Sequence, residues 1–168
     1  TQSTVETLQK VGVVSLTAER VRMLEEYRAD RSYPPVRSAD LALLESVLDS
    51  GCSMVALIGP TGAGKSVMLD ALYRRYPQGE VVIVPDIDPF ASEASNSSGL
   101  MLARSVLREG AARLVLLDET LKSLTPSEER TELESMACAI EGSDKQVVIV
   151  LHSRSNLAWF KEVVNLDA

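Results

Sequence analysis

The sequence contains few of the residues from which disulfide frameworks and metal cages are built. Among its 168 residues there are two cysteines, Cys52 and Cys138, and one histidine. Two cysteines at this spacing match neither a disulfide scaffold nor a zinc motif, and they favour a reducing, cytoplasmic type of compartment. Apolar runs are short as well, because residues 54–58 (MVALI) are far fewer than the roughly 20 that a membrane-spanning helix needs. The sequence therefore predicts no membrane span.

Positive charge is also scarce. The chain has 17 Lys and Arg residues against 24 Asp and Glu residues, which gives a net charge of −7. This balance argues against a surface that binds nucleic acid over its whole extent, although a local basic channel formed on assembly is compatible with it. Apolar residues make up 45% of the chain, which excludes wholesale disorder and fits one globular domain of this length.

The chain divides into a short N-terminal part and a main body. Residues 1–36 carry an amphipathic helical pattern that ends at residues 32–35 (SYPP), and we interpret them as a helical appendage. Residues 37–168 form the predicted core domain. Its first element is a helix with Ser38 as its N-cap and Gly51 at its end.

Short apolar segments then alternate with amphipathic ones. Strands that are apolar on both faces and separated by helices form parallel sheets, so the pattern predicts an α/β fold with helices on both faces of the sheet. Trp159 and Phe160, in the last predicted helix, are expected in the core. The predicted strands are 54–58, 81–84, 114–117 and 147–151, and the predicted helices are 66–76, 100–109, 127–140 and 156–164.

Residues 59–66 (GPTGAGKS) match the phosphate-binding pattern G-x-x-x-x-G-K-[ST] at every fixed position, between a predicted strand and a predicted helix. The glycines let backbone N–H groups point at phosphate oxygens, and the helix adds its positive end. Lys65 is placed to neutralise the β- and γ-phosphates, and the Ser66 hydroxyl to ligate Mg²⁺. The residues expected to bind ATP or another nucleoside triphosphate (NTP) are Gly59, Pro60, Thr61, Gly62, Ala63, Gly64, Lys65, Ser66 and Val67.

An acidic pair follows the third predicted strand, where the second half of a metal site is expected. Asp118 would hold Mg²⁺ through water, and Glu119 would orient and polarise the attacking water. Asp86, at the end of the second strand, is the alternative water-activating carboxylate, because some motor ATPases place that group there. Either assignment predicts a nucleoside triphosphatase.

His152 follows the fourth predicted strand and is expected at the ligand crevice, where it can bond the γ-phosphate or the attacking water. The alternative is a histidine with a structural role alone. Several cations are candidates for contacts with a neighbouring subunit's nucleotide or with a polymer, although each is also compatible with a solvated surface charge. These residues are Arg104, Arg108, Arg113, Arg154, Lys122 and Lys145.

The loop at 59–66, the segment 114–119 and the segment 147–153 together resemble the core of RecA-like motor ATPases. Within that group, residues 103–122 and 147–156 are similar to the hexameric packaging NTPase of double-stranded-RNA bacteriophages (cystoviruses). This resemblance implies a homo-hexameric ring that moves RNA through a central channel, associated with a viral procapsid in the cytoplasm or the virion. It also implies that the strand before His152 lies between the Asp118 strand and the loop strand, and that further strands follow.

The type II and type IV secretion and pilus-retraction ATPases are the second group that the chain resembles. The similarity lies in residues 59–62 and 107–109, and in 151–153, which look like the histidine box of those enzymes. They usually carry Gly-Glu at the position of Asp118, whereas the packaging enzymes usually carry asparagine at the position of His152. A small-molecule kinase and a nucleotide-binding switch are further alternatives. A transporter-type ATPase is disfavoured because residues 99–110 contain no Leu-Ser-Gly-Gly signature.

Overall fold

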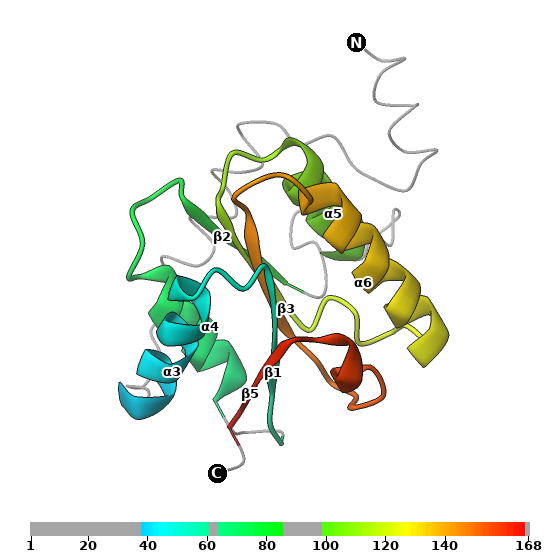
Figure 1. The fold of residues 1–168 in the computed structure, drawn as a ribbon, viewed down its shortest axis with the longest axis horizontal. Coiled ribbons are helices and arrows are strands. Elements are labelled where there is room, and N and C mark those ends of the chain that lie inside the picture. The colour runs from blue at the N-terminus through cyan, green and yellow to red at the C-terminus, as the bar shows by residue number, and fades with distance from the viewer. Residues whose placement is uncertain (1–37, 61–63, 86–98, 167–168) are drawn as a thin grey trace, which may run out of the picture.

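The computed structural model describes residues 38–60, 64–85 and 99–166, and in these ranges five parallel strands form one sheet (Figure 1). The predicted α/β class is therefore confirmed. The order across the sheet is β2-β3-β4-β1-β5, so β4 lies between β3 and β1, as the resemblance implied. The strands are β1 (Met54–Ile58), β2 (Val81–Pro85), β3 (Leu114–Asp118), β4 (Gln146–Val150) and β5 (Glu162–Asn165).

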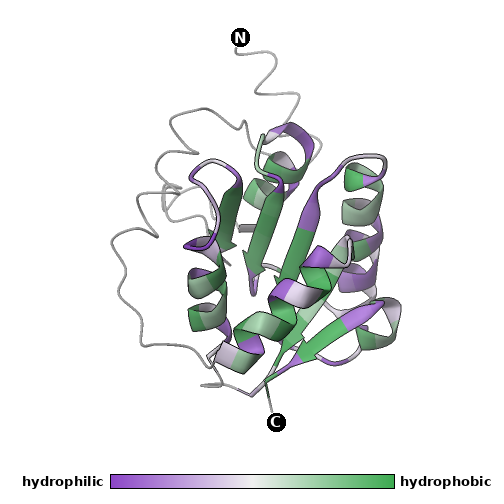
Figure 2. Ribbon diagram, turned by 60° about the vertical axis from the view of Figure 1, so that its left-hand side comes forward, coloured by the Kyte–Doolittle hydropathy of each residue, from purple (hydrophilic) through white to green (hydrophobic). Residues whose placement is uncertain are grey.

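Helices cover both faces of the sheet and create two cores. Helices α3 (Ser38–Asp49) and α4 (Lys65–Tyr73) pack on one face, and α5 (Gly99–Glu109) and α6 (Pro126–Ile140) pack on the other (Figure 1). Successive strand residues point to opposite faces and are mostly apolar on both, which gives the strands their mainly green colour in Figure 2. The polar faces of the helices are turned outward.

The ends of the helices follow local rules. α6 begins with a capping box, in which the Thr125 hydroxyl accepts from the backbone N–H of Glu128 while the Glu128 carboxylate accepts from that of Thr125. α4 ends at Tyr73 instead of the expected Tyr76. Beyond Tyr73, the backbone N–H groups of Arg75 and Tyr76 donate to carbonyls three residues earlier, which is a tighter turn than an α-helix. Pro77 also disfavours helical geometry at Tyr76, the residue before it. α3 begins at Ser38, one residue earlier than its interpretation as an N-cap implied.

The prediction of a last helix over 156–164 is wrong. The segment forms a short 3-10 helix, η2 (Leu157–Trp159), and then β5, which pairs in parallel with the outer edge of β1. Phe160 is buried and makes an edge-to-face contact with the partly buried Trp159, so their expected place in the core is confirmed. An unpaired edge of β1 offered this segment backbone hydrogen bonds that outweigh its helical spacing.

All five strands end at the same edge of the sheet because they are parallel. Residues 59–60, 118–119 and 151–154 therefore emerge together at the carboxyl edge, although they are far apart in the sequence. Ligands of open α/β sheets bind at this edge.

Candidate functional site

The phosphate-binding loop leads from the end of β1 into α4. Residues 61–63, its middle part, lie outside the described residues. Gly64 immediately before the helix has φ 94°, and a Cβ added there would meet nothing within 4 Å. Glycine is therefore needed for its left-handed backbone conformation and not for space. The Gly64 carbonyl accepts the N–H of Met68 at 2.8 Å, which starts the hydrogen-bond ladder of α4.

Lys65 lies folded over this loop. Its Nζ donates to the carbonyl of Gly59 and is 3.5 Å from the carbonyl oxygen of Pro60. The ammonium is thus held at the beginning of the loop, beside the carbonyls of residues 59 and 60. A half-buried cation in this place can neutralise phosphate charge more effectively than one in bulk water.

The Ser66 hydroxyl and the Asp118 carboxylate meet at this site. Ser66 Oγ donates to Asp118 Oδ1 at 3.1 Å, and both side chains are half-buried. Asp118 shares its side of the strand with Leu114 and Leu116, which pack in the core beneath α4. The alternation of β3 therefore turns Asp118 toward the beginning of α4.

These two oxygens fit one Mg²⁺ ion. Ser66 Oγ can ligate Mg²⁺ directly while Asp118 Oδ1, hydrogen-bonded to it at 3.1 Å, can hold a water of the same ion, as the sequence predicts. Among the described residues no group of three or more His, Cys, Asp or Glu side chains could hold a metal ion. The pair is therefore suited to a cation that takes its other ligands from water and phosphate, as Mg²⁺ usually does.

Glu119 has an uncommon backbone conformation for a residue with a side chain. Its φ is 61°, and it is the one residue other than glycine with positive φ among those described. Such a conformation costs of order 1–3 kcal/mol and is found most often at functional sites. The Glu119 carbonyl accepts the N–H of Lys122 at 3.1 Å, which closes a turn directly after β3. The strain ends the strand sharply and separates the direction of the Glu119 side chain from that of Asp118.

Asp86, the alternative water-activating carboxylate, lies outside the described residues. Pro85, the residue before it, pairs in register with Asp118 at the ends of β2 and β3. The assignment of the base to Glu119 or to Asp86 therefore stays open.

His152 lies on an open pocket of about 330 Å³ beside the phosphate-binding loop. Its imidazole is exposed. The pocket lies between the ends of β1 and β4, and its walls combine backbone of the loop with polar side chains of the segment after β4. The residues that line it are Ile58, Gly59, Pro60, Leu151, His152, Ser153 and Arg154. His152 thus lies on a pocket at the expected edge of the sheet, while its place at a ligand crevice and its role in sensing the γ-phosphate stay predictions.

The arginines that were candidates for action on a neighbouring subunit occupy different environments. Arg104 pairs with Glu132 between α5 and α6, and Arg113 lies 3.4 Å from Glu80. Arg113 lies at the amino edge of the sheet, opposite the candidate site, and Arg108 is in the last turn of α5, which leads to that edge. Arg154 is the candidate that lines the pocket.

Lys145, a candidate for contact with a polymer, instead binds carbonyl groups of its own chain. Its Nζ donates to the Gly110 carbonyl and lies 3.4 Å from the Ala112 carbonyl oxygen, so it satisfies carbonyls just beyond α5. Burial lowers the pKa of the Lys145 ammonium, and the neighbouring Asp144 opposes this shift. Lys145 precedes β4 at the amino edge, far from the site. Lys122, in contrast, is exposed in the turn after Glu119.

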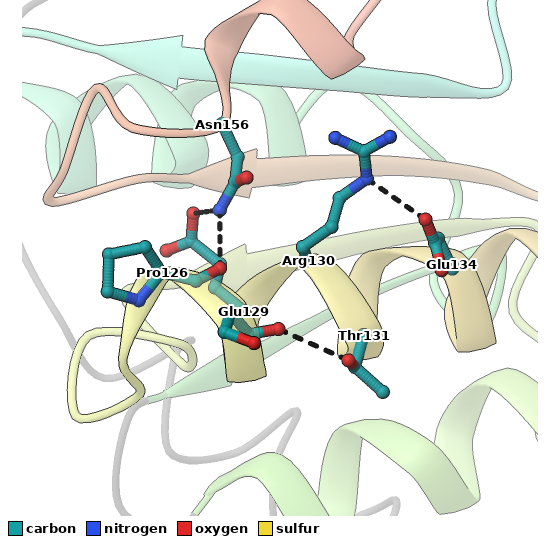
Figure 3. Close-up of polar contacts among 7 residues, drawn as sticks. Pro126, Glu129, Arg130, Thr131, Glu134 and Asn156 are labelled. Carbon is teal, nitrogen blue, oxygen red and sulfur yellow. Dashed lines mark hydrogen bonds and ion pairs between the residues drawn. The ribbon is translucent and has the colours of Figure 1, made fainter.

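Two polar residues near the site were missed by sequence reasoning. Asn156 Nδ2 donates to the Pro126 carbonyl and to Glu129 Oε1, each at 2.9 Å (Figure 3). Glu129 is only 3% exposed. A signal for it was available, because Glu129 stands in line with the buried residues of α6, namely Leu133, Met136 and Ile140. A carboxylate on an apolar stripe requires a partner.

Comparisons with known proteins add little to this geometry. No protein-family model and no curated protein matches the chain. A solved structure of a bacterial Atm1-family ABC exporter with ATP bound has a TM-score of 0.48 and 19% sequence identity over 68% of this chain. The aligned part spans 32% of the exporter chain, so the similarity covers only part of each structure. Among the described residues, no helix is long and apolar enough to cross a membrane.

Proposed function

We propose that the chain binds an NTP with Mg²⁺ and hydrolyses its terminal phosphoanhydride bond. The observation that carries this proposal is the contact of Ser66 Oγ with Asp118 Oδ1 at 3.1 Å, directly beside Lys65. A strand-to-helix turn with a structural role alone has no need of a serine, a carboxylate and a lysine together at one sheet edge. The phosphate-binding pattern in the sequence supports the same conclusion.

In the proposed reaction, the loop and the start of α4 bind the phosphates through backbone N–H groups, and Lys65 neutralises part of their charge. Ser66 and Asp118 would hold Mg²⁺, which supplies charge stabilisation to the phosphate oxygens when bound. Glu119 accepts a hydrogen bond from the attacking water and orients it toward the γ-phosphorus. His152 and Arg154 line the open pocket beside the loop.

The finer proposal is that the working form is a hexameric ring that moves RNA through its centre. It is supported by the resemblance to cystoviral packaging NTPases and by the position of β4 between β3 and β1. It is also supported by the chemistry of the site. Among the described residues of the loop and the strand ends, Lys65 is the one lysine proposed to bind the phosphates, so a further cation would have to come from elsewhere. An arginine from an adjacent subunit would add the cation that many NTPases use in the transition state.

A secretion-type hexameric ATPase is the second candidate. One observation favours it, namely the position of His152 on the pocket beside the phosphate-binding loop, where the histidine box of those enzymes is expected. The two candidates differ in the polymer that stimulates turnover, because a packaging motor responds to nucleic acid.

The test is phosphate release from Mg²⁺–ATP by the parent chain and by Lys65→Ala, with Lys161→Ala as the matched control. Lys161 is an exposed lysine before β5, at the opposite edge of the sheet. We expect Lys65→Ala to fold but to lose nucleotide binding or turnover, and Lys161→Ala to keep both. Turnover by Lys65→Ala at the parent rate would contradict the proposed site. Phosphate transfer to a small acceptor would indicate a kinase, and tight binding without release would indicate a switch.

A further inference from the structure

Asn156 connects two segments that are distant in the sequence. Its side-chain amide donates one hydrogen bond to the Pro126 carbonyl and one to Glu129 Oε1, both at 2.9 Å (Figure 3). Pro126 and Glu129 belong to the first turns of α6, whereas Asn156 immediately precedes η2. The contact therefore links the beginning of α6, which precedes β4 in the chain, to the segment that follows β4.

Each linked segment follows a strand that ends at the candidate site. α6 is preceded by the turn that contains Glu119, and Asn156 lies four positions after His152. Both connections are short and hydrogen-bonded internally. The Glu119 carbonyl accepts from Lys122 at 3.1 Å, and the Arg154 carbonyl accepts from Leu157 at 3.3 Å. Because these connections are held internally, a displacement at the α6 end is passed to the Glu119 turn.

The burial of Glu129 indicates that the contact is not incidental. The residue occupies the apolar stripe of α6, where a leucine would bury more apolar surface at a lower desolvation cost. Among the described residues, Asn156 is the one side chain that donates to the Glu129 carboxylate. The position of the carboxylate near the N-terminus of α6 reduces the cost of its charge. The hydrogen-bonded pair Asn156–Glu129, called the tie below, therefore connects α6 to the segment after β4.

We propose that Asn156 and Glu129 are positioning residues that hold the Glu119 turn and the His152 loop at a fixed separation. The inference rests on the proposed function, in which Glu119 orients water and the His152 loop forms the wall of the pocket. Preorganisation of this kind affects turnover more than binding, because the phosphates are held mainly by the loop at 59–66. In the proposed reaction, Asn156 and Glu129 are not assigned a contact with the nucleotide or the attacking water.

The first test uses Asn156→Ala and the size-matched Asn156→Asp, which removes the donor and places a second carboxylate opposite Glu129. We expect kcat to fall about tenfold or more for both, with the nucleotide Kd within about twofold of the parent value. Assays are run well below the unfolding midpoint, which the fluorescence of Trp159, the single tryptophan, reports for each variant. This arrangement separates a loss of positioning from a loss of folded protein.

The second test is rescue by a conservative variant and comparison with a matched control. Glu129→Gln keeps a side-chain oxygen that can accept from Asn156, so its turnover is expected near that of the parent, whereas Glu129→Ala is expected to behave as Asn156→Ala. The control is Arg130→Ala, which breaks the exposed pair of Arg130 with Glu134 at 3.0 Å on the same helix (Figure 3). Both members of that pair lie on α6, so the pair does not join α6 to another element. Its loss is expected to leave kcat unchanged.

The outcomes distinguish the inference from the function on which it rests. If the parent turns over NTP in a manner that requires Lys65, while the Asn156 variants keep the parent kcat, the tie has no positioning role and the inference alone is overturned. The inference is likewise overturned if kcat falls only in proportion to the unfolded fraction. If the parent shows no turnover that depends on Lys65, both the proposed function and the inference are wrong.

Discussion

Ser66 Oγ lies 3.1 Å from Asp118 Oδ1, although 52 positions separate the two residues in the chain. The fold produces this contact through two regularities. Parallel pairing brings the ends of β1 and β3 to one edge of the sheet, with β4 between them. Alternation along β3 then turns Asp118 to the face that α4 covers, where Leu114 and Leu116 also point. A hydroxyl and a carboxylate that can serve one cation are thereby brought together from separate elements.

The first prediction concerns this pair. Ser66→Ala and Asp118→Asn should each raise the Mg²⁺ concentration needed for half-maximal turnover by about tenfold or more, because the first removes an oxygen ligand and the second removes the negative charge that holds the ion through water. The double variant should lose little beyond the more severe single variant, since the two groups act as one unit. A Mg²⁺ titration of phosphate release measures both effects. Ser46→Ala, on the exposed face of α3, is the control; equal responses of all three variants would refute a shared site.

The second prediction addresses the water-activating carboxylate. Glu119→Gln should keep nucleotide affinity and lower kcat by about 10²-fold or more, because the amide orients water but accepts its proton poorly. The measurement is single-turnover hydrolysis together with nucleotide binding. Asp86→Asn is compared in parallel. Should Asp86→Asn abolish turnover while Glu119→Gln changes it little, the base lies after β2 and the assignment to Glu119 is wrong.

The third prediction follows from the backbone at Glu119, where φ is 61°. Glu119→Gly should raise the free energy of unfolding by up to about 1 kcal/mol, because glycine adopts this conformation without steric strain, and it should abolish turnover. Glu119→Ala, which keeps the strain but lacks the carboxylate, is the matched comparison. Denaturant unfolding of the two variants checks the difference. A Glu119→Gly variant less stable than Glu119→Ala would show that the turn is not strained.

The fourth prediction concerns pH and the capping box of α6. Hydrogen bonds from the Thr125 backbone and then its side chain lower the pKa of the Glu128 carboxyl below its usual range. A carboxylate with a lowered pKa in the folded state stabilises the protein above its ordinary pKa, and this stabilisation is lost as the pH falls through the lowered value. Stability measured between pH 7 and pH 3 should therefore fall less steeply in Glu128→Gln than in the parent. Identical slopes would contradict this contribution.

The fifth prediction tests assembly and the polymer. If hydrolysis requires an arginine from a neighbouring subunit, specific activity should fall as the protein is diluted below the concentration at which rings form. RNA should stimulate turnover at low salt, and the stimulation should weaken as salt is raised, because the contacts are to backbone phosphates. Native mass measurements with nucleotide give the subunit number. Activity that is constant across a dilution series of monomers would exclude the ring mechanism.

The sequence by itself determined the phosphate-binding loop, the first four strands along the chain and the α/β class. These features depend on local chemistry: apolar runs define buried strands, and the glycine, lysine and serine spacing of residues 59–66 has few uses other than phosphate binding. Asp118 could be predicted as the partner of Ser66 because it directly follows an apolar run. The pairing of strands that brings the two oxygens together is a property of the folded sheet and cannot be read from the local sequence.

Tertiary structure decided the remainder. Residues 162–165 became strand β5 because β1 had an edge to pair, although their spacing with Trp159 and Phe160 favoured a helix. Lys145 became a partner of carbonyls beyond α5 instead of a surface cation. Asn156 and Glu129 met because β4 and α6 place their ends together. Each outcome depends on which unpaired polar group or sheet edge lies nearby in space, and local sequence carries no record of such neighbours.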